Sequence, residues 1–593
     1  MFRPLQALLL LAIFTLVGCS KGCSGRGGGG DAVLNSITIP LVSNLKGLDP
    51  VLSSDEYSND VGGNIYEGLL QYNYLKRPLT PEPALADGMP TVSKDGLTHT
   101  FKIKKGVRFH DSEAFPEGKG REVVATDFIY SWKRLADTKT KSEGFWIFDG
   151  RIKGFNEWRD RLTKGEGKFD EAIEGLQAPD PHTLVITLNR PYYQLNYVLT
   201  MTYAGVHPRE AVEKYGPEFL NHPVGTGPFR FVSWTRGNKV VLERNANWRG
   251  ETYPTEGEAG DEEKGLLADA GKAIPFVDQL VFMEIVEDQP RWLNLMKGVL
   301  DIGAIPKDNF ETVFDEQRNL KPDIVNKGMK LAVFSRSDVT YISFNMADPL
   351  FGKNRDLRIA LSLAYDDRTA ATKFYNNLVI PAFSPIAPDM DGWDPNYVNP
   401  NRLYNVEKAK EHLKKAGYPD GKGLPVLEYS TTGSTTARQM AEYLSQQFEQ
   451  IGVKTKINMN SWPQFQERIR TRKAQMWGIA WSADYPDAEN MFQLLYGKNV
   501  SPGPNAANFE NKEFDSLYEQ SQKLPPGPAR TAIYLKMRDV FAREMPWITN
   551  NHRKGYTVYQ GWLTNMKRNM TIKNYYKYLR VDEAKKKELK AKL

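Results

Sequence analysis

Cysteine is almost absent from this chain of 593 residues, which contains only Cys19 and Cys23. Because both lie near the amino terminus, the rest of the chain can form neither a disulfide framework nor a cysteine-based zinc site. The seven histidines are scattered, and none stands at the HxxxH or HExxH spacing of metal ligands. The Gly-x-x-x-x-Gly-Lys-Ser/Thr loop that cradles nucleotide phosphates is also missing. We therefore expect no metal, no cofactor and no nucleotide hydrolysis.

The chain also lacks a large excess of charge of either sign. The formal net charge is +6, from 78 basic and 72 acidic residues that are spread along the chain. Because nucleic-acid-binding proteins usually carry a basic stripe, this balance argues against nucleic acid as a partner. A content of 40% hydrophobic and 25% charged residues is ordinary for a soluble globular protein. The length exceeds what one hydrophobic core supports, so several domains are expected.

The amino terminus reads as a secretion signal. Met1-Phe-Arg3 is followed by a mostly apolar run that ends in Leu16-Val17-Gly18-Cys19, which resembles a bacterial lipobox. The resemblance implies a signal peptide over 1–18 and lipid attachment to Cys19, which would hold the protein on a membrane. Residues 19–32 are glycine-rich and are expected to form a flexible tether. An uncleaved anchor, or a plain signal peptide with an incidental cysteine, is the alternative.

Strands and helices alternate in the second half of the chain. The patterns predict helices over 406–416 and 437–451 and strands over 426–430 and 453–457, as in a parallel-rich α/β lobe. The apolar run from Trp477 ends in a polar turn that Pro486 closes. Such a strand delivers Trp481, Ser482 and Asp484 to the edge of a sheet, where ligands commonly bind. A charged, glycine-rich stretch over 251–272 is expected to be a surface insertion.

Six short motifs occur in an order that resembles one family. They are Leu48-Asp-Pro50, Phe109-His-Asp111, Gly225-Thr-Gly-Pro-Phe229, Tyr341-Ile-Ser-Phe-Asn345, the helix Asp356 to Arg368, and Trp481-Ser-Ala-Asp484. Over residues 34–579 the chain is similar to the extracytoplasmic solute-binding proteins of peptide ABC transporters, family 5. The resemblance implies an α/β fold of the two-lobed periplasmic-binding-protein type II, with an extra domain inserted in the first lobe. The implied limits are 33–63, 178–338 and 547–593 for lobe I, 64–177 for the inserted domain II, and 339–546 for lobe II.

The function that this resemblance implies is binding without bond breaking. A peptide would be enclosed between the lobes by hinge closure and delivered to an ABC permease. The protein would be a monomer, anchored by lipid on the periplasmic side of the cell envelope. In the family, the Trp-x-x-Asp turn holds the free amino group of the peptide, a role that falls on Asp484. Neighbouring residues would share in ligand binding: Trp481, Ser482, Ala483, Tyr485, Glu56, Tyr57 and Asn345.

The residues that hold the peptide carboxylate in known relatives are missing. An arginine of the dipeptide binders falls where this chain has Thr431, and an arginine and a histidine of the oligopeptide prototype fall at Gly478 and Thr436. We therefore expect a longer peptide or another cationic partner, with Arg470 and Arg438 as candidates. A nickel complex, a murein peptide or an oligosaccharide are alternative solutes. An envelope hydrolase that uses Asp484 and Asp487, and a merely solvated Asp484, are alternatives of another kind.

Overall fold

The computed structural model describes residues 35–593. The predicted signal peptide, the tether and the lipidation of Cys19 lie outside the described residues. Within 35–593, no helix has both the length and the apolar character needed to cross a membrane. The same part of the chain holds no group of three or more His, Cys, Asp or Glu side chains placed to bind a metal ion.

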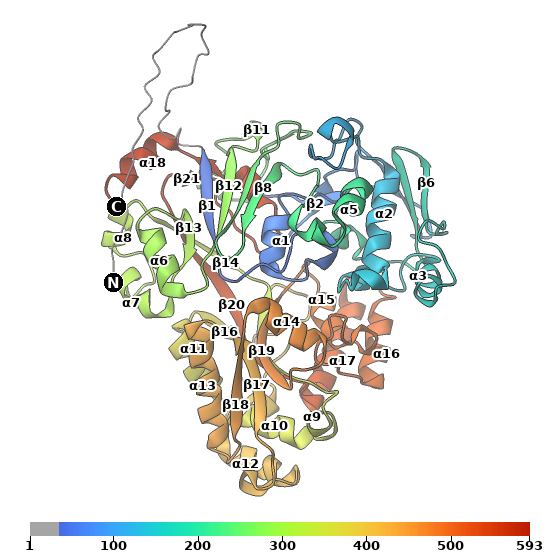
Figure 1. Cartoon of the computed structure of the whole chain (residues 1–593). Helices are drawn as coiled ribbons and strands as arrows, with labels where there is room; N and C mark the ends of the chain where they lie inside the picture. Colours follow the sequence, from blue (N-terminus) through green and yellow to red (C-terminus); the bar gives the residue numbers. More distant parts are fainter. Residues whose placement is uncertain (1–34) are drawn as a thin grey trace, which may run out of the picture. The chain divides into compact units, whose positions relative to one another are not determined.

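The first strand of the described chain belongs to a four-stranded sheet with the order β1-β12-β9-β8 (Figure 1). The strands are β1 (Ser36–Leu41), β12 (Gln279–Glu284), β9 (Lys239–Arg244) and β8 (Phe229–Thr235). Buried and partly exposed residues alternate along β1, as expected for a strand with one face on a core. β1 runs parallel to β12, and the other two pairs are antiparallel. Residues that are far apart in sequence therefore build one side of the fold.

A second, antiparallel sheet has the order β4-β5-β7-β6. Its strands are β4 (Thr91–Val92), β5 (Thr98–Lys102), β7 (Thr183–Thr187) and β6 (Leu176–Asp180). Only β4 and β5 lie wholly within the range 64–177 expected for the inserted domain: its limit at 177 falls inside β6, and β7 lies beyond it. Three further strand pairs are β2 (Leu70–Tyr72) with β3 (Pro81–Pro83), β10 (Glu251–Thr252) with β11 (Ala273–Ile274), and β21 (Leu563–Thr564) with β22 (Arg580–Val581).

The largest sheet has eight strands and carries the predicted ligand-binding strand. Its main path is β13-β20-β15-β19-β17-β18, and β14 and β16 also pair with β20. Their bounds are β13 (Ile302–Ala304), β14 (Lys330–Ser335), β15 (Asp338–Phe344), β16 (Val379–Pro381), β17 (Leu427–Thr432), β18 (Thr455–Asn460), β19 (Met476–Ser482) and β20 (Trp547–Tyr559). The strands predicted over 426–430 and 453–457 correspond to β17 and β18.

One long strand, β20, connects the two halves of this sheet (Figure 1). Its first half pairs with β15 and β16, and its second half, from Lys554 to Tyr559, pairs with β14 and β13. β14 and β15 are also consecutive in the chain and are separated only by Arg336 and Ser337. Two neighbouring segments therefore pass between the halves side by side, which is the arrangement that a hinge between two lobes requires.

The helices cover both faces of the large sheet. Alternating residues of β15 face different helices: Ile342 and Phe344 belong to the core of α10, α12 and α13, whereas Val339 and Tyr341 belong to the core of α16 and α17. Over the whole described chain, including the parts away from this sheet, the α-helices are α1 (Glu56–Gly62), α2 (Ala125–Ala136), α3 (Phe155–Lys164), α4 (Leu195–Val198), α5 (Arg209–Tyr215), α6 (Asp288–Met296), α7 (Phe310–Val313), α8 (Pro322–Asn326), α9 (Pro349–Lys353), α10 (Arg355–Ala364), α11 (Asp367–Tyr375), α12 (Val406–Lys415), α13 (Thr435–Glu449), α14 (Trp462–Arg470), α15 (Glu489–Phe492), α16 (Lys512–Ser521), α17 (Pro528–Glu544) and α18 (Glu583–Lys590).

The stretch predicted as a surface insertion is anchored to the end of the chain. Asp261 and Asp269 are buried, although the segment around them is charged. Asp261 pairs with Lys567 and Asp269 with Arg580, each over 2.6 Å. These pairs fix the segment that follows β21. That segment forms part of the cavity described next.

Candidate functional site

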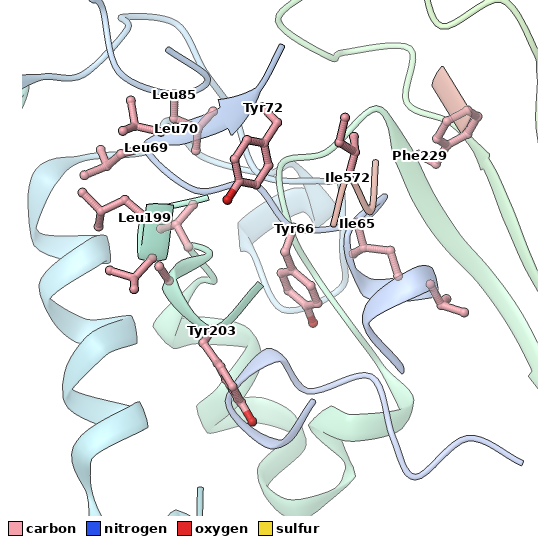
Figure 2. Close-up of a cluster of buried hydrophobic side chains, with 14 of the residues drawn as sticks. Ile65, Tyr66, Leu69, Leu70, Tyr72, Leu85, Leu199, Tyr203, Phe229 and Ile572 are labelled. Atoms are coloured by element: carbon pink, nitrogen blue, oxygen red, sulfur yellow. The ribbon is translucent and has the colours of Figure 1, made fainter. Parts of the chain in front are cut away.

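A cavity of about 1170 Å³ lies between two sets of segments. One wall comes from β1, the α1 region, β13 and residues 568–576, and the other from β15, β17, β19 and the start of α13 and α14. Small-molecule pockets usually measure about 300–1,000 Å³, so this cavity has room for a ligand larger than most metabolites. Tyr66, Tyr72 and Tyr203 line it and also belong to a buried apolar cluster (Figure 2). The walls are therefore fixed by the core of the protein.

The end of β19 reaches this cavity as the sequence predicts. Trp481, Ser482, Ala483 and Asp484 all line it. β19 pairs antiparallel with β15, and Ser482 lies opposite Asp338 at the end of the ladder. The backbone O of Ala483 accepts a hydrogen bond from Oγ1 of Thr571 over 3.3 Å, which ties this turn to the opposite wall.

Asp484 is the carboxylate of this turn. Its Oδ2 accepts a hydrogen bond from Nδ2 of Asn490 over 2.9 Å. No basic side chain of residues 35–593 lies within 4.0 Å of it. Burial raises the pKa of Asp484 to about 6, although the Asn490 amide and the positive charge of Lys573 act in the opposite direction. An incompletely solvated carboxylate that has no ion pair within 4.0 Å among residues 35–593 is suited to bind a cation.

Glu56 and Tyr57 also reach the cavity, from the start of α1. Asp55 caps that helix by accepting hydrogen bonds from the backbone N–H groups of Tyr57 and Ser58. Glu56 lies 3.4 Å from Arg336, and the Tyr57 ring meets the Trp462 ring edge-on at 5.6 Å. Burial acts to raise the pKa of Glu56, but Arg336 and other nearby cations lower it to about 2. Glu56 is thus ionised and already paired.

A cluster of charges stands on the same wall as Glu56. Its basic side chains are Arg336, Arg553, Arg568 and Lys573, and its acidic ones are Glu56, Asp60 and Asp338. Arg336 pairs with Glu56 over 3.4 Å, Arg553 with Asp338 over 2.7 Å and Lys573 with Asp60 over 3.1 Å. Arg568 is the basic residue of this cluster without an ion pair: within residues 35–593 no carboxylate oxygen lies within 4.0 Å of its guanidinium.

Arg568 lines the cavity, and its guanidinium nitrogens are not all engaged in hydrogen bonds within the described chain. One Nη donates to Oγ1 of Thr557 over 3.3 Å, whereas the buried Nε has no partner in the described chain. The neighbouring Lys567 is held by Asp261 and by Glu258, each over 2.6 Å, which fixes the backbone beside Arg568. No local sequence motif marks Arg568, so sequence reasoning does not single it out.

Two of the predicted site residues lie away from the cavity. Tyr485 is fully buried, stacks on Tyr197 at 5.9 Å and donates to Oε2 of Glu489 over 2.5 Å. Asn345 is buried at the end of β15, where its Nδ2 donates to the backbone O of Arg472 over 3.1 Å. Both side chains satisfy their polar atoms inside the protein. They position the neighbouring backbone and do not face the cavity.

The two arginines considered for a ligand carboxylate also differ in place. Arg470 lines the cavity but pairs with Glu467 of its own helix over 2.7 Å, and Arg438 is exposed and does not line it. A Cβ at position 478 would collide with the hydroxyl of Tyr429. Tyr429 therefore fills the space that a side chain at Gly478 would need.

The arrangement does not suit hydrolysis by a carboxylate pair. Asp487 does not line the cavity, and its oxygens accept hydrogen bonds from Arg530, Tyr534 and Gln194 over 2.8, 2.8 and 3.1 Å. Asp484 therefore has no second free carboxylate beside it to share acid and base roles. His110, a part of the sequence motifs, is buried elsewhere, with Nε2 2.9 Å from the backbone O of Gly227.

Known proteins resemble this chain over most of its length. The model of the bacterial extracellular solute-binding proteins, family 5 Middle, matches residues 80–503. Heme-binding protein A of Haemophilus influenzae is 27% identical over 523 residues, with 86% of each chain covered. The oligopeptide-binding protein OppA of Bacillus subtilis is 26% identical over 571 residues, which cover 92% of this chain and 95% of that one.

The fold is also found in a solved structure with a bound peptide. The periplasmic binding protein DppA from Helicobacter pylori, in complex with the peptide STSA, superposes with a TM-score of 0.75 at 22% identity, covering 92% of this chain and 98% of that one. The α/β fold is thus the two-lobed type II periplasmic-binding-protein fold, as the sequence predicts. Because the family match spans most of the chain, this protein belongs to the bacterial extracellular solute-binding proteins of family 5, which are binding proteins and not enzymes.

Proposed function

We propose that this protein binds peptides in the cavity between its lobes and delivers them to an ABC permease. The observation that carries the proposal is a pair of opposite charges on the cavity wall, Asp484 and Arg568, neither of which has an ion pair within 4.0 Å among residues 35–593. A peptide with free ends carries one charge of each sign. Because charges enclosed in a low-dielectric site need partners, such a ligand complements the two residues. The names of the OppA and DppA relatives support the same solute class.

In this proposal Asp484 receives the peptide amino group. One carboxylate oxygen is held by Asn490, and the other is free to accept from an ammonium. The indole Nε1 of Trp481 is engaged by Oδ1 of Asn490 over 3.0 Å, so the indole forms a fixed wall beside the carboxylate. The backbone near Ser482 and Ala483 lies at the end of a strand and can pair with an extended peptide. Main-chain pairing ignores side chains and would allow broad specificity.

Arg568 receives the peptide carboxylate in this proposal. The guanidinium of arginine fits a carboxylate with two parallel hydrogen bonds, and only one hydrogen bond, to Thr557, engages the Arg568 guanidinium among residues 35–593. Glu56 and Tyr57 would contribute to the wall and its charge, since Glu56 is already paired with Arg336. Solutes bound through a metal ion suit the cavity less well, because neither histidine nor cysteine lines it among residues 35–593.

The placement in the cell belongs to the proposal as well. A lipid on Cys19 would hold the protein on the periplasmic side of the envelope as a monomer, with residues 19–32 as a tether. We also propose lobe I over 33–63, 178–338 and 547–593, domain II over 64–177 and lobe II over 339–546. Extending domain II to the end of β7 at Thr187 would keep its sheet in one piece.

The direct experiment is to purify the protein without denaturation and to identify the solute that comes with it by mass spectrometry. The proposal predicts peptides with a free amino group and a free carboxylate. Recovery of an oligosaccharide, a nickel complex or a solute without an amino group as the stoichiometric ligand would contradict it. Incubation with peptides should yield no cleavage products.

A further inference from the structure

A second, smaller cavity of about 290 Å³ lies outside the proposed peptide site. One side is formed by residues between 146 and 156 together with Arg190, and the other by residues between 496 and 519. Trp146 lines both cavities and stands between them. The volume is at the lower end of the range for ligand pockets. It suits a small ion with a few waters, since one water occupies about 30 Å³ in the liquid.

Arg151 is a buried cation in this cavity, and two of its guanidinium nitrogens have no hydrogen-bond partner among residues 35–593. The residue is 6% exposed, and its guanidinium stacks on the ring of Tyr192 at 4.3 Å. Its Nε and Nη1 are buried and have no hydrogen-bond partner within the described residues. The nearest carboxylate, Glu489, is 3.8 Å from Nη2. Leaving buried donors unsatisfied costs roughly 1–3 kcal/mol, so a further acceptor is expected here.

Glu489 does not fill that need. Its carboxylate already accepts hydrogen bonds from the hydroxyls of Tyr485 and Tyr518 and from Nε2 of Gln522. Three donors thus already occupy the Glu489 carboxylate, and no hydrogen bond joins it to Nε or Nη1 of Arg151. The cavity is the remaining place from which an acceptor can reach them.

Arg190 brings a second guanidinium to the same cavity. Its buried Nε also has no partner in the described chain. Burial lowers the pKa of Arg190, and the positive charge of Arg151 lowers it further, so the two cations are close enough to repel each other. Two arginines that face one cavity repel each other, and an anion between them would offset this repulsion.

The acidic residues around the cavity are engaged elsewhere. Asp149 accepts a hydrogen bond from Nδ2 of Asn156 over 2.5 Å. Glu519 pairs with Lys498 over 2.8 Å and accepts from the hydroxyl of Tyr496 over 2.7 Å. None of these groups lies within 4.0 Å of Arg190.

We propose that this cavity binds a free small oxyanion, such as phosphate or sulfate, between Arg151 and Arg190. The free nitrogens of the two guanidiniums supply donors for its oxygens, as arginine forks commonly do. The anion would touch segments from both sides, 146–190 and 496–519, and so would stabilise their contact. If the two sides separate when the lobes open, anion and cargo would each strengthen the binding of the other.

The test uses inorganic phosphate and the full-length protein without peptide. Its thermal unfolding midpoint is measured against rising phosphate, with chloride at equal ionic strength as the blank. A ligand that binds only the folded state raises this midpoint. The native protein should show a saturable rise. Arg190→Gln should weaken the apparent phosphate affinity at least about tenfold, the scale of one charge-assisted hydrogen bond. Arg190 is half-buried, so this variant is expected to fold.

Arg161→Gln is the matched control. It removes the same charge from the exposed pair with Glu171 and should leave the phosphate response unchanged. Equal phosphate responses of native protein and Arg190→Gln would overturn the proposal. A second arm compares peptides with free and amidated carboxyl ends. If Arg190→Gln weakens only the free-acid peptide, the cavity holds the cargo carboxylate, and a free anion is the wrong occupant. Since the phosphate arm uses no peptide, its failure is separable from failure of the proposed function.

Discussion

Asn490 and Asp484 are joined by two hydrogen bonds that run in opposite directions. Nδ2 of Asn490 donates to the carboxylate of Asp484 over 2.9 Å, and Oδ1 of Asn490 accepts from the backbone N–H of Asp484 over 3.0 Å. The same Oδ1 accepts from the indole of Trp481. A single buried amide therefore fixes both the proposed amine-binding carboxylate and the aromatic wall beside it.

We predict that Asn490→Ala weakens the binding of free-amine peptides about tenfold, because Asp484 loses the donor that orients it and favours its ionised form. The variant should also lose roughly 1–3 kcal/mol of unfolding free energy. Isothermal titration and urea unfolding would measure both. Asn505→Ala is the control: it removes a buried amide of the same lobe, bound to the backbone of Tyr496 and Phe509. It should reduce stability and leave affinity intact. Unchanged affinity of Asn490→Ala would contradict the prediction.

A second prediction concerns Asp484→Asn in the protein without ligand. Because burial raises the folded-state pKa of Asp484 to about 6, above its unfolded value, ionisation costs stability as the pH rises from about 4 to 6. The amide carries no charge. The free energy of unfolding of the variant should exceed that of the native protein by about 1–3 kcal/mol at pH 7.5, where the upper value is the free-energy equivalent of the Asp484 pKa shift. Near pH 4 the two proteins should be equally stable. Urea unfolding at the two pH values measures this difference. A less stable variant at pH 7.5 would count against an unpaired carboxylate.

Arg568→Gln should lower the affinity for peptides with a free carboxylate by roughly 10- to 100-fold, as expected for a hydrogen-bonded charge pair. Amidated peptides should bind the variant and the native protein alike. Lys554→Gln is the control, because Lys554 also lines the cavity but is exposed. Titration calorimetry with the two peptide forms gives the comparison. An equal loss for both forms would mean that Arg568 acts on the structure and not on the carboxylate.

A contact between the two proposed lobes predicts an effect on affinity that is independent of ligand charge. Oγ1 of Thr436, at the start of α13, donates to Oδ2 of Asp288 in α6 over 2.6 Å. Thr436→Val keeps the shape and removes this bond, so the closed state should lose about 1 kcal/mol. Affinity should then fall about fivefold for every peptide, since closure and binding are coupled.

The control for this variant is Thr435→Val. Thr435 is exposed and contacts Glu287 through its backbone N–H, which valine retains. It should bind as the native protein does. If Thr436→Val lowered the affinity only for peptides with a free amino group, or only for those with a free carboxylate, Thr436 would contact the ligand directly and would not act through lobe closure.

The sequence was informative where the signal is local. The apolar run and Pro486 placed the end of β19 at the cavity, and the order of short motifs indicated the fold. Tyr485 is expected in the site because it follows Asp484, and Asn345 because it ends the Tyr341–Asn345 motif. Both side chains are buried in the protein interior, which neither adjacency nor a motif reveals. Residues 547–559 form one continuous strand, β20, because partners from both halves of the sheet pair with it, and no local pattern marks that role.

Arg568 was out of reach of sequence reasoning for a different reason. Its importance follows from a charge balance among residues from four distant parts of the chain, including Glu56, Arg336 and Lys573. No spacing in the sequence encodes which of several arginines is left without a carboxylate. The same applies to Arg151 and Arg190, which line one cavity only because of tertiary packing.

The central claim is that the Asp484 carboxylate holds a cationic amino group inside the cavity. The most direct measurement is the affinity of one peptide in its free-amine and N-acetylated forms, for the native protein and for Asp484→Asn, by titration calorimetry. The account predicts that native protein prefers the free amine by at least about 30-fold, the cost of breaking a buried charge pair, and that the variant shows no preference. Equal binding of the two forms by the native protein would contradict it.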